Sequence, residues 1–296
     1  VGLKTLYGEN SPYAYRSNGT IESVKSITRD DLQTFWGRHY APQNSALVLT
    51  GDITKTEARS LADKYFASWK AIGEVAAVSV PEPPPAPARR IVIVDRPGAP
   101  QTATGAFGLG LPRNTPQYAA VTVMNNVLGG MFSSRINMNL REKHGYTYGA
   151  ISRFAFFRGV GPFYAYAQVR TDVTAPAAGE LLKELNRIRT DPPTPDELKL
   201  AREGELRSLP GHFETAASTS SLISDLFTYN LPDDYYRTLP GKYEALTPAQ
   251  IEETAKDDVH PDNLILVTVG DRAKIQPGLE KLNLGPIEIR TPAATW

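Results

Sequence analysis

The sequence predicts an α+β protein made of two related domains, in each of which helices cover a β-sheet. Three observations support this prediction: an internal repeat, a proline-rich segment between its two copies, and strands that are grouped early in residues 91–296 and followed by a run of helices. With 296 residues, 41% of them apolar, and 32 basic against 32 acidic side chains, the chain is expected to be soluble and globular.

The internal repeat aligns residues 26–52 with residues 245–271 without a gap. Each copy, SITRDDLQTFWGRHYAPQNSALVLTGD and ALTPAQIEETAKDDVHPDNLILVTVGD, predicts an amphipathic helix capped by a threonine, a Pro-x-Asn turn, and a buried strand that ends at Gly-Asp. A second helix follows each strand. In the first copy the expected strand is SALVLTG, and Phe35, Trp36 and Tyr40 are expected to form the packed face of the helix before it.

The repeat also predicts the domain organisation. Residues 1–80 are expected to be the C-terminal part of a first domain, residues 81–90 a semi-rigid proline-rich linker, and residues 91–296 a complete second domain. The second domain has about 130 residues more before its repeat copy than the first, which suggests that the first domain is N-terminally incomplete in this chain. We expect the chain to be a fragment, and a naturally reduced first domain is the alternative.

The second domain has a clear order of predicted elements. Strands are expected at 90–98, 101–111, 148–157 and 161–170, and helices at 116–130, 133–145, 173–190, 194–208, 214–229 and 232–244, before the second repeat copy. The strand after Tyr148, GAISRFAFF, is expected either to pair with an extended peptide at its edge or to be a core strand with a covered edge.

Several kinds of site are excluded by the local sequence. The absence of cysteine excludes disulfides, thiolate zinc sites and a cysteine nucleophile. No charge excess calls for nucleic acid, and no segment has the roughly 20 apolar residues that a membrane helix needs. Phosphate-binding glycine loops and a Gly-x-Ser-x-Gly turn are also missing. No two histidines have the spacing of a metal pair on one helix face; the four are His39, His144, His212 and His260.

The stretch LREKHGYTYGA, residues 140–150, contains half of a candidate site. Arg141 lies in the last turn of a predicted helix that Gly145 ends, and Tyr148 begins the next strand. A guanidinium and a phenol that converge on one point are donors suited to a carbonyl oxygen or a developing oxyanion. The alternative is that Arg141 makes a surface ion pair and Tyr148 is a half-buried strand aromatic.

The segment VLGGMFSSRINMNLREKHGYTYGA, residues 127–150, resembles the signature of the second domain of insulinase and pitrilysin metallopeptidases, a family that includes the mitochondrial processing peptidase. Residues 11–52 resemble the later half of that family's first domain, with its Pro-Tyr, Thr-x-Glu-Ser and Tyr-x-Pro-x-Asn landmarks. The resemblance implies that Arg141 and Tyr148 are catalytic and stabilise the tetrahedral intermediate.

The resemblance also implies a substrate-binding segment just before Arg141. Its members would be Gly129 and Gly130 of a glycine-rich loop, with Ser133 and Ser134 after it. The alternative for the glycines is an ordinary helix end followed by a new helix.

In active members of the family, a His-x-x-Glu-His helix and a later Glu of the first domain hold zinc. That motif is absent from this chain, so zinc is expected in the full-length protein or a partner subunit, with no metal bound here. The chain is therefore interpreted as part of a zinc metalloendopeptidase that hydrolyses peptides in a closed chamber, or as a non-catalytic partner subunit or scaffold of the same fold. The expected partners are a peptide substrate and a homodimer or heterodimer mate, or the missing N-terminal piece; a periplasmic location is the family's suggestion.

Overall fold

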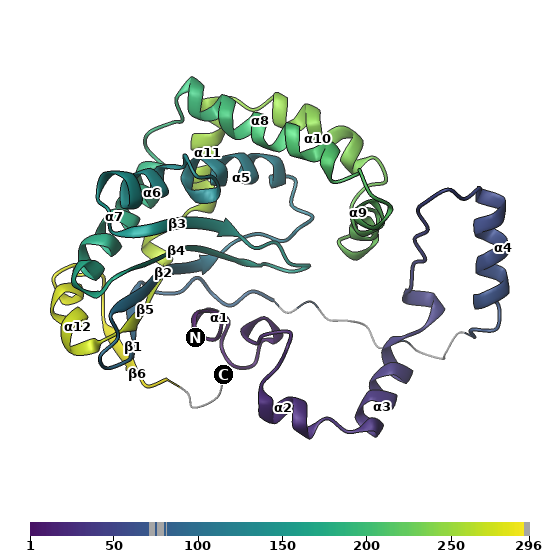
Figure 1. Ribbon diagram of the computed structural model, residues 1–296, viewed down its shortest axis with the longest axis horizontal. Helices are drawn as coiled ribbons and strands as arrows, with labels where there is room; N and C mark the ends of the chain where they lie inside the picture. The colour runs from purple at the N-terminus through teal and green to yellow at the C-terminus, as the bar shows by residue number, and fades with distance from the viewer. Residues whose placement is uncertain (71–74, 76–79, 81, 293–296) are drawn as a thin grey trace. The chain divides into compact units, whose positions relative to one another are not determined.

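A computed structural model describes residues 1–70, 75, 80 and 82–292 and divides the chain into two compact units (Figure 1). Unit 1 comprises Val1–Arg16, Pro81–Leu206 and Arg237–Ala294, and unit 2 comprises Ser17–Val80, Arg207–Tyr236 and Thr295–Trp296. The predicted domain limits of 1–80, 81–90 and 91–296 stay a prediction. Of the predicted linker, Pro81 lies outside the described residues, and residues 82–89 have no regular secondary structure.

Unit 1 is built on one six-stranded mixed sheet in the order β3-β4-β2-β5-β1-β6 (Figure 1). The strands are β1 (Arg90–Asp95), β2 (Gln101–Leu109), β3 (Thr147–Phe154), β4 (Pro162–Arg170), β5 (Ile265–Gly270) and β6 (Ile287–Arg290). β5 lies between β2 and β1, antiparallel to the first and parallel to the second. The second repeat copy therefore supplies a central strand of the sheet, as its apolar sequence predicts. The four-residue edge strand β6 is not predicted.

The helices of unit 1 are α1 (Gly2–Tyr7), α5 (Tyr118–Asn125), α6 (Arg135–Asn137), α7 (Thr174–Arg187), α11 (Pro248–Asp258) and α12 (Arg272–Glu280). α8 (Pro195–Gly211) and α10 (Tyr235–Glu244) lie mostly in it. Short 3₁₀ helices are η1 (Pro12–Ala14), η5 (Thr171–Val173) and η6 (Pro261–Asn263). Helices on a mixed sheet give the predicted α+β architecture.

Strand β1 is buried on both faces of the sheet, which explains its continuous apolar run RIVIVD. Ile91 and Ile93 belong to a core that α7 and α12 complete on one face. Val92, between them, belongs to a second core on the other face, where α1 and η1 contribute side chains. The alternation follows from the two-residue period of a strand. On each face, the apolar side chains of the sheet and of the helices that cover it are buried together away from water, which stabilises the fold.

Two tyrosines fasten residues 1–16 to the hairpin between β3 and β4. The Tyr7 hydroxyl donates to the Val160 carbonyl at 2.9 Å, and the Tyr13 hydroxyl accepts the Gly159 amide at 2.8 Å. The Tyr13 ring also packs edge-on against Phe157, with 4.9 Å between centroids. Burial raises the pKa of Tyr7, so its hydroxyl stays protonated and remains a donor. Residues 1–16 therefore belong physically to the sheet of unit 1.

Unit 2 contains α2 (Ile21–Ser26), α3 (Arg29–His39), the 3₁₀ helix η2 (Pro42–Asn44), α4 (Lys55–Phe66) and α9 (Ala216–Thr228). Capping boxes begin α3 at Thr28 and α4 at Thr54, as the sequence predicts for the first. The predicted strand SALVLTG is wrong, because residues 45–50 have no regular secondary structure. A strand needs a neighbouring ladder for its backbone groups, and the described part of unit 2 contains no strand.

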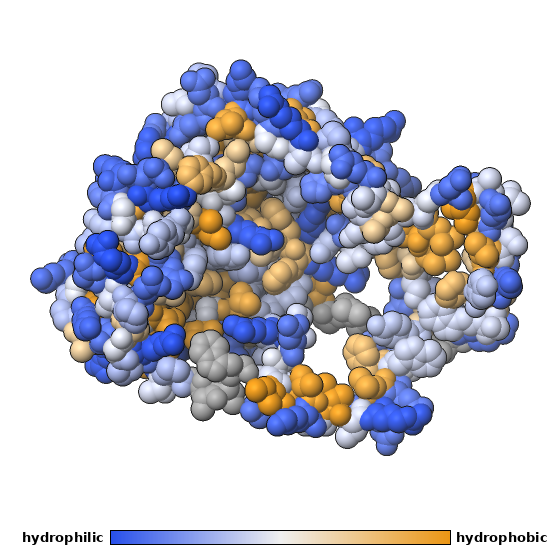
Figure 2. Space-filling view, in the orientation of Figure 1, coloured by the Kyte–Doolittle hydropathy of each residue, from blue (hydrophilic) through white to orange (hydrophobic). Residues whose placement is uncertain are grey.

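The prediction that Phe35, Trp36 and Tyr40 form a packed face is also wrong in this structure. They are 56%, 58% and 52% exposed, respectively. Figure 2 shows further apolar side chains at the surface of unit 2, over α2 and α4. The second repeat copy supplies the physical reason. There Ile251, at the position of the 60% exposed Leu32, is fully buried because α11 packs on α5, whereas the described residues of unit 2 form no such layer on α3.

Candidate functional site

The candidate site begins in a helical segment that is not regular α-helix. The predicted helix 116–130 is α5 followed by the π-helix η3 (Asn126–Gly130), and the predicted helix 133–145 is α6 followed by the π-helix η4 (Met138–Lys143). In a π-helical turn each backbone hydrogen bond spans five residues along the chain, one more than in an α-helix. Such turns occur frequently at functional sites. The spacing of apolar residues does not distinguish them from α-helix, so the sequence did not reveal them.

Gly145 ends this segment, as predicted. Its φ of 62° lies in the left-handed region, where a side chain is disfavoured. Its amide donates to the Arg141 carbonyl at 3.0 Å, and the next amide, Tyr146, donates to the Leu140 carbonyl at 2.9 Å. The helix end is thereby closed, and the chain turns at once into β3.

Arg141 projects from η4 with 38% of its side chain exposed. Its guanidinium carbon lies 4.6 Å from the centre of the Phe132 ring, and its Nε lies 3.3 Å from the Glu142 carboxylate. Phe132 is itself 62% exposed, so the pair forms a surface stack that orients the flat face of the cation. Arg141 therefore makes the surface ion pair of the alternative interpretation, with Glu142, but its guanidinium remains accessible to solvent.

Tyr148 lies in an irregular part of β3 and is 92% exposed. The pairing of β3 with β4 is regular from Ala150 onward and shifts in register between Thr147 and Ala150. Thr147 Oγ1 lies 2.7 Å from the Gln168 carbonyl oxygen and accepts the Gly149 amide at 3.1 Å, which fixes the bulge. The alternative of a half-buried strand aromatic does not apply to Tyr148.

The predicted substrate-binding residues are placed differently from one another. Gly129 is buried, and a Cβ there would lie 2.3 Å from the Ser152 amide nitrogen, so the glycine serves a close backbone approach. Ser134 is also buried, at 2% exposure. Gly130 and Ser133 are exposed at the surface. Substrate binding by these four residues stays a prediction, and only the two exposed residues can contact a ligand without a rearrangement.

Arg135 anchors the segment from inside. Its Nε and one terminal nitrogen each lie 2.8 Å from a Glu197 oxygen, and it also donates to the Asp191 and Pro192 carbonyls. This bidentate bond lowers the pKa of Glu197 to about 2. A buried arginine with every partner supplied holds the start of α6 against the start of α8.

Asn139 provides a second anchor on the same turn as Arg141. Its amide nitrogen donates to Glu180 at 2.8 Å and to Glu184 at 2.6 Å, both on α7. The hydrogen bond from Asn139 holds the pKa of Glu180 below its usual value. Asparagine is uncommon inside helices. The presence of Asn139 within a predicted helix is therefore the sequence signal that could identify it as an anchor.

At two positions of the edge strand β3, backbone groups that could pair with a further strand are hydrogen-bonded to side chains of the protein. The Asn125 amide donates to the Ser152 carbonyl at 3.1 Å, and its carbonyl accepts the Ser152 hydroxyl at 2.7 Å. The Ala150 amide donates to Asn137. These contacts favour the covered-edge alternative over pairing with a peptide at Ala150 and Ser152.

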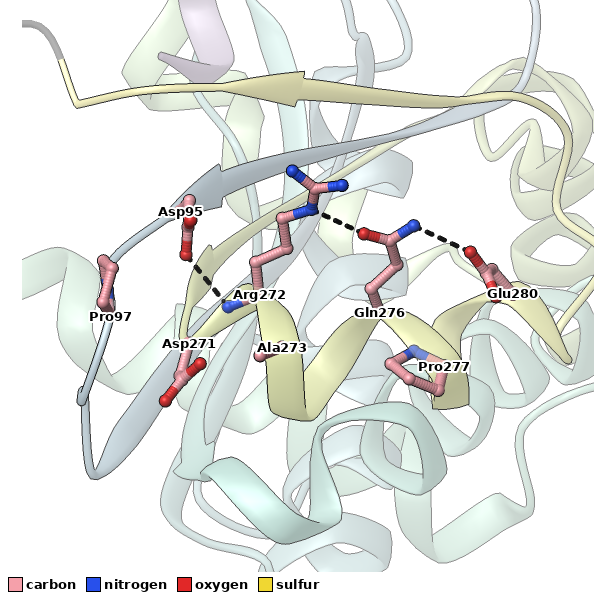
Figure 3. A pocket seen from close by; sticks show the side chains of 8 residues that line it. All are labelled: Asp95, Pro97, Asp271, Arg272, Ala273, Gln276, Pro277 and Glu280. Atoms are coloured by element: carbon pink, nitrogen blue, oxygen red, sulfur yellow. Dashed lines mark hydrogen bonds between the residues drawn. The ribbon is translucent and has the colours of Figure 1, made fainter.

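A separate cavity lies where β1 and β5 end, beside the start of α12, and holds none of the predicted site residues (Figure 3). Its polar side chains bond mainly within the protein: Asp95 accepts the Arg272 amide at 3.1 Å, and Arg272 Nε donates to Gln276 at 2.7 Å. Gln276 in turn donates to Glu280 at 2.8 Å. These hydrogen bonds between the lining residues account for the polar side chains of the cavity without a ligand.

Residues 1–70, 75, 80 and 82–292 contain no group of three or more His, Cys, Asp or Glu side chains placed to hold a metal ion. Within the same ranges, no helix combines the length and apolarity needed to cross a bilayer.

Comparison with known proteins places these features in a family. Residues 26–205 match the family described as the peptidase M16 inactive domain. An uncharacterized zinc protease of Mycobacterium leprae is 26% identical over 257 residues, which are 85% of this chain and 56% of that protein. A Helicobacter pylori protein described as a non-peptidase homolog is 24% identical over 277 residues, covering 92% and 62%.

The fold has a solved counterpart. The crystal structure of a peptidase M16 inactive domain from Pseudomonas fluorescens superposes with a TM-score of 0.83 and 28% identity, over 91% of this chain and 64% of that one. The chain spans little more than half the length of the curated relatives given above.

Proposed function

Since this chain belongs to the peptidase M16 inactive-domain family, we propose that it is the substrate-binding and oxyanion-stabilising portion of a zinc-dependent metalloendopeptidase that hydrolyses peptides in a closed chamber. The observation that carries the proposal is the exposed pair of donors at one helix-to-strand turn. Arg141 is stacked on Phe132 at the end of a π-helix, and Tyr148 projects almost fully into solvent seven residues later.

Both donors suit the same chemical task. The guanidinium is permanently charged and offers several N–H groups, and the phenol offers one O–H. Directed at a scissile carbonyl, they would stabilise the negative charge that develops on its oxygen in the tetrahedral intermediate. Donors in comparable sites contribute roughly 3 to 4 kcal/mol each to the transition state.

Zinc enters this proposal only through residues that this chain does not supply. The ion would be held by the rest of the full-length protein or by a partner subunit, where it would activate a water molecule. The partners proposed are the peptide substrate and a homodimer or heterodimer mate, or an N-terminal piece. The exposed Phe35, Trp36 and Tyr40 support a covering partner for unit 2.

A second function is supported by the relatives themselves. The Helicobacter pylori relative is described as a non-peptidase homolog. The chain would then be part of a non-catalytic partner subunit, or of a scaffold of the same fold without proteolysis.

Peptide cleavage by the full-length protein tests both functions, alone and mixed with a zinc-binding relative, with and without a chelator. Arg141→Ala and Tyr148→Phe should each lower kcat by about 100-fold or more. Arg96→Ala, just after β1, and Tyr15→Phe, just after η1, are matched controls that should leave kcat within about twofold, because both side chains are exposed and neither lies at the β3 edge of the sheet. Unchanged kcat in the first two variants contradicts oxyanion stabilisation, and inertness in every mixture favours the scaffold.

A further inference from the structure

Asn137, the last residue of α6, connects the two segments that carry Arg141 and Tyr148. Its side chain is buried, at 4% exposure. Its amide nitrogen donates to the Phe132 carbonyl at 2.7 Å, and its amide oxygen accepts the Ala150 amide at 3.1 Å. One side chain therefore bridges the loop before α6 and the start of the regular part of β3.

At the first end of this bridge, the fixed group is the backbone of Phe132. The ring of that residue stacks on the Arg141 guanidinium, and it is 62% exposed. Its position therefore depends largely on its own backbone. A hydrogen bond that holds the Phe132 carbonyl restricts where the ring can lie, and with it the face that the cation covers.

At the second end, the fixed group is the amide that follows the bulge in β3. Tyr148 lies inside the bulge, and its hydroxyl has no hydrogen-bond partner among the described residues. The backbone therefore positions its ring. Thr147 holds one end of the bulge against β4, and Asn137 holds the other end at Ala150.

We propose that Asn137 is a positioning residue that sets the spacing between the Arg141 guanidinium and the Tyr148 hydroxyl. The inference rests on the proposed function, because it concerns the same two donors. An amide suits the role since it donates and accepts at once, which neither a carboxylate nor an alkyl side chain can do. A misplacement of about 1 Å in a catalytic group can cost a factor of about 100 in rate.

The test compares variants of the full-length protein, in its active mixture, by kcat and KM for peptide cleavage and by hydrogen exchange of the Ala150 amide. Asn137→Ala should lower kcat by about 10- to 100-fold with KM within about threefold, and should accelerate exchange at Ala150. Asn137→Asp keeps the acceptor for Ala150 and loses the donor to Phe132. It should lower kcat similarly while exchange at Ala150 stays slow, and it serves in place of Asn137→Ala if that variant does not fold.

Asn125→Ala is the matched control, because it removes two hydrogen bonds to β3 at Ser152, beyond the bulge. It should leave kcat within about twofold, the usual result for a change away from the reacting groups. If the Asn137 variants change kcat no more than Asn125→Ala, or if Ala150 exchange is unaffected by Asn137→Ala, the inference is overturned. If Arg141→Ala and Tyr148→Phe leave kcat unchanged, the proposed function fails, and the bridge then has a structural role only.

Discussion

The Arg141 guanidinium carbon lies 4.6 Å from the centre of the Phe132 ring, and both side chains reach solvent. Stacking on an exposed aromatic face contributes about 0.5 to 1 kcal/mol and fixes the plane of the cation. The contact links the loop after η3 to the residue expected to meet the substrate.

Replacing this ring should therefore weaken function without unfolding the protein. Phe132→Leu should lower kcat/KM for peptide cleavage about two- to fivefold, because the stacking energy is lost. Phe132→Tyr keeps an aromatic face and should stay near the wild-type value. Met138→Leu, an exposed change at the first residue of η4, controls for altered surface apolarity. Equal kcat/KM for Phe132→Leu and Phe132→Tyr would rule out a role for the ring face.

Gly129→Ala should destabilise unit 1 by about 1 to 3 kcal/mol in urea unfolding, because the added Cβ would lie 2.3 Å from the Ser152 amide nitrogen and push η3 away from β3. Gly149→Ala is the matched control in β3 itself, where an added Cβ meets no heavy atom within 4 Å. It should change the free energy of unfolding by less than about 0.5 kcal/mol. Equal losses in both variants would show that the close approach at Gly129 is unimportant.

The Glu197 carboxylate should make stability depend on acid pH. Its hydrogen bonds to Arg135 lower its pKa from 4.5 to about 2 in the folded protein, so its stabilisation is present above pH 4.5 and lost as pH falls toward 2. Since the group is partly solvated, the loss should be about 1 to 2 kcal/mol. Unfolding measured from pH 6 to pH 2 should show this loss in the wild type. In Glu197→Gln most of it should be absent, and an unchanged pH profile in that variant would contradict the assignment.

Asp258 should have the opposite effect. Burial, and then the neighbouring Asp257 carboxylate, raises its pKa from 3.8 to about 6, so it favours folding below pH 3.8, and this contribution is lost as pH rises through 6. Asp258→Asn should therefore be more stable than the wild type by about 1 to 2 kcal/mol at pH 8. The difference should vanish near pH 4. Thermal unfolding at pH 8 and pH 4 measures this stability difference. Asp257→Asn, at an exposed position, should give a smaller difference of the same kind. A stability difference between Asp258→Asn and the wild type that does not depend on pH would exclude titration of Asp258 as its cause.

The two repeat copies show what sequence patterns can and cannot predict. Thr28 and Thr247 both cap helices as predicted, because a capping box is decided within four residues. The strand after the turn forms only in the second copy, where β1 and β2 lie on either side of residues 265–270. A capping signal is local, whereas a strand depends on partners far along the chain, so the same pattern succeeds in one copy and fails in the other.

The candidate site divides in the same way. Arg141 and Tyr148 stand in a motif that is visible in one stretch of sequence, and Gly145 has the predicted left-handed conformation. Asn137 and Phe132 were not found, because their importance comes from contacts across a loop and a strand rather than from their own spacing. The π turns were missed because the apolar pattern there fits an α-helix equally well.

The attachment of residues 1–16 to the sheet has a consequence for how the protein is made. Tyr7 packs with Ile265 and Val267, which leave the ribosome roughly 260 residues later, on the order of tens of seconds at ordinary rates of synthesis. Until β5 has emerged, α1 lacks part of its core and the sheet lacks the strand that joins β2 to β1. The apolar side chains of α1 therefore stay without part of their core until the last third of the chain has been synthesised.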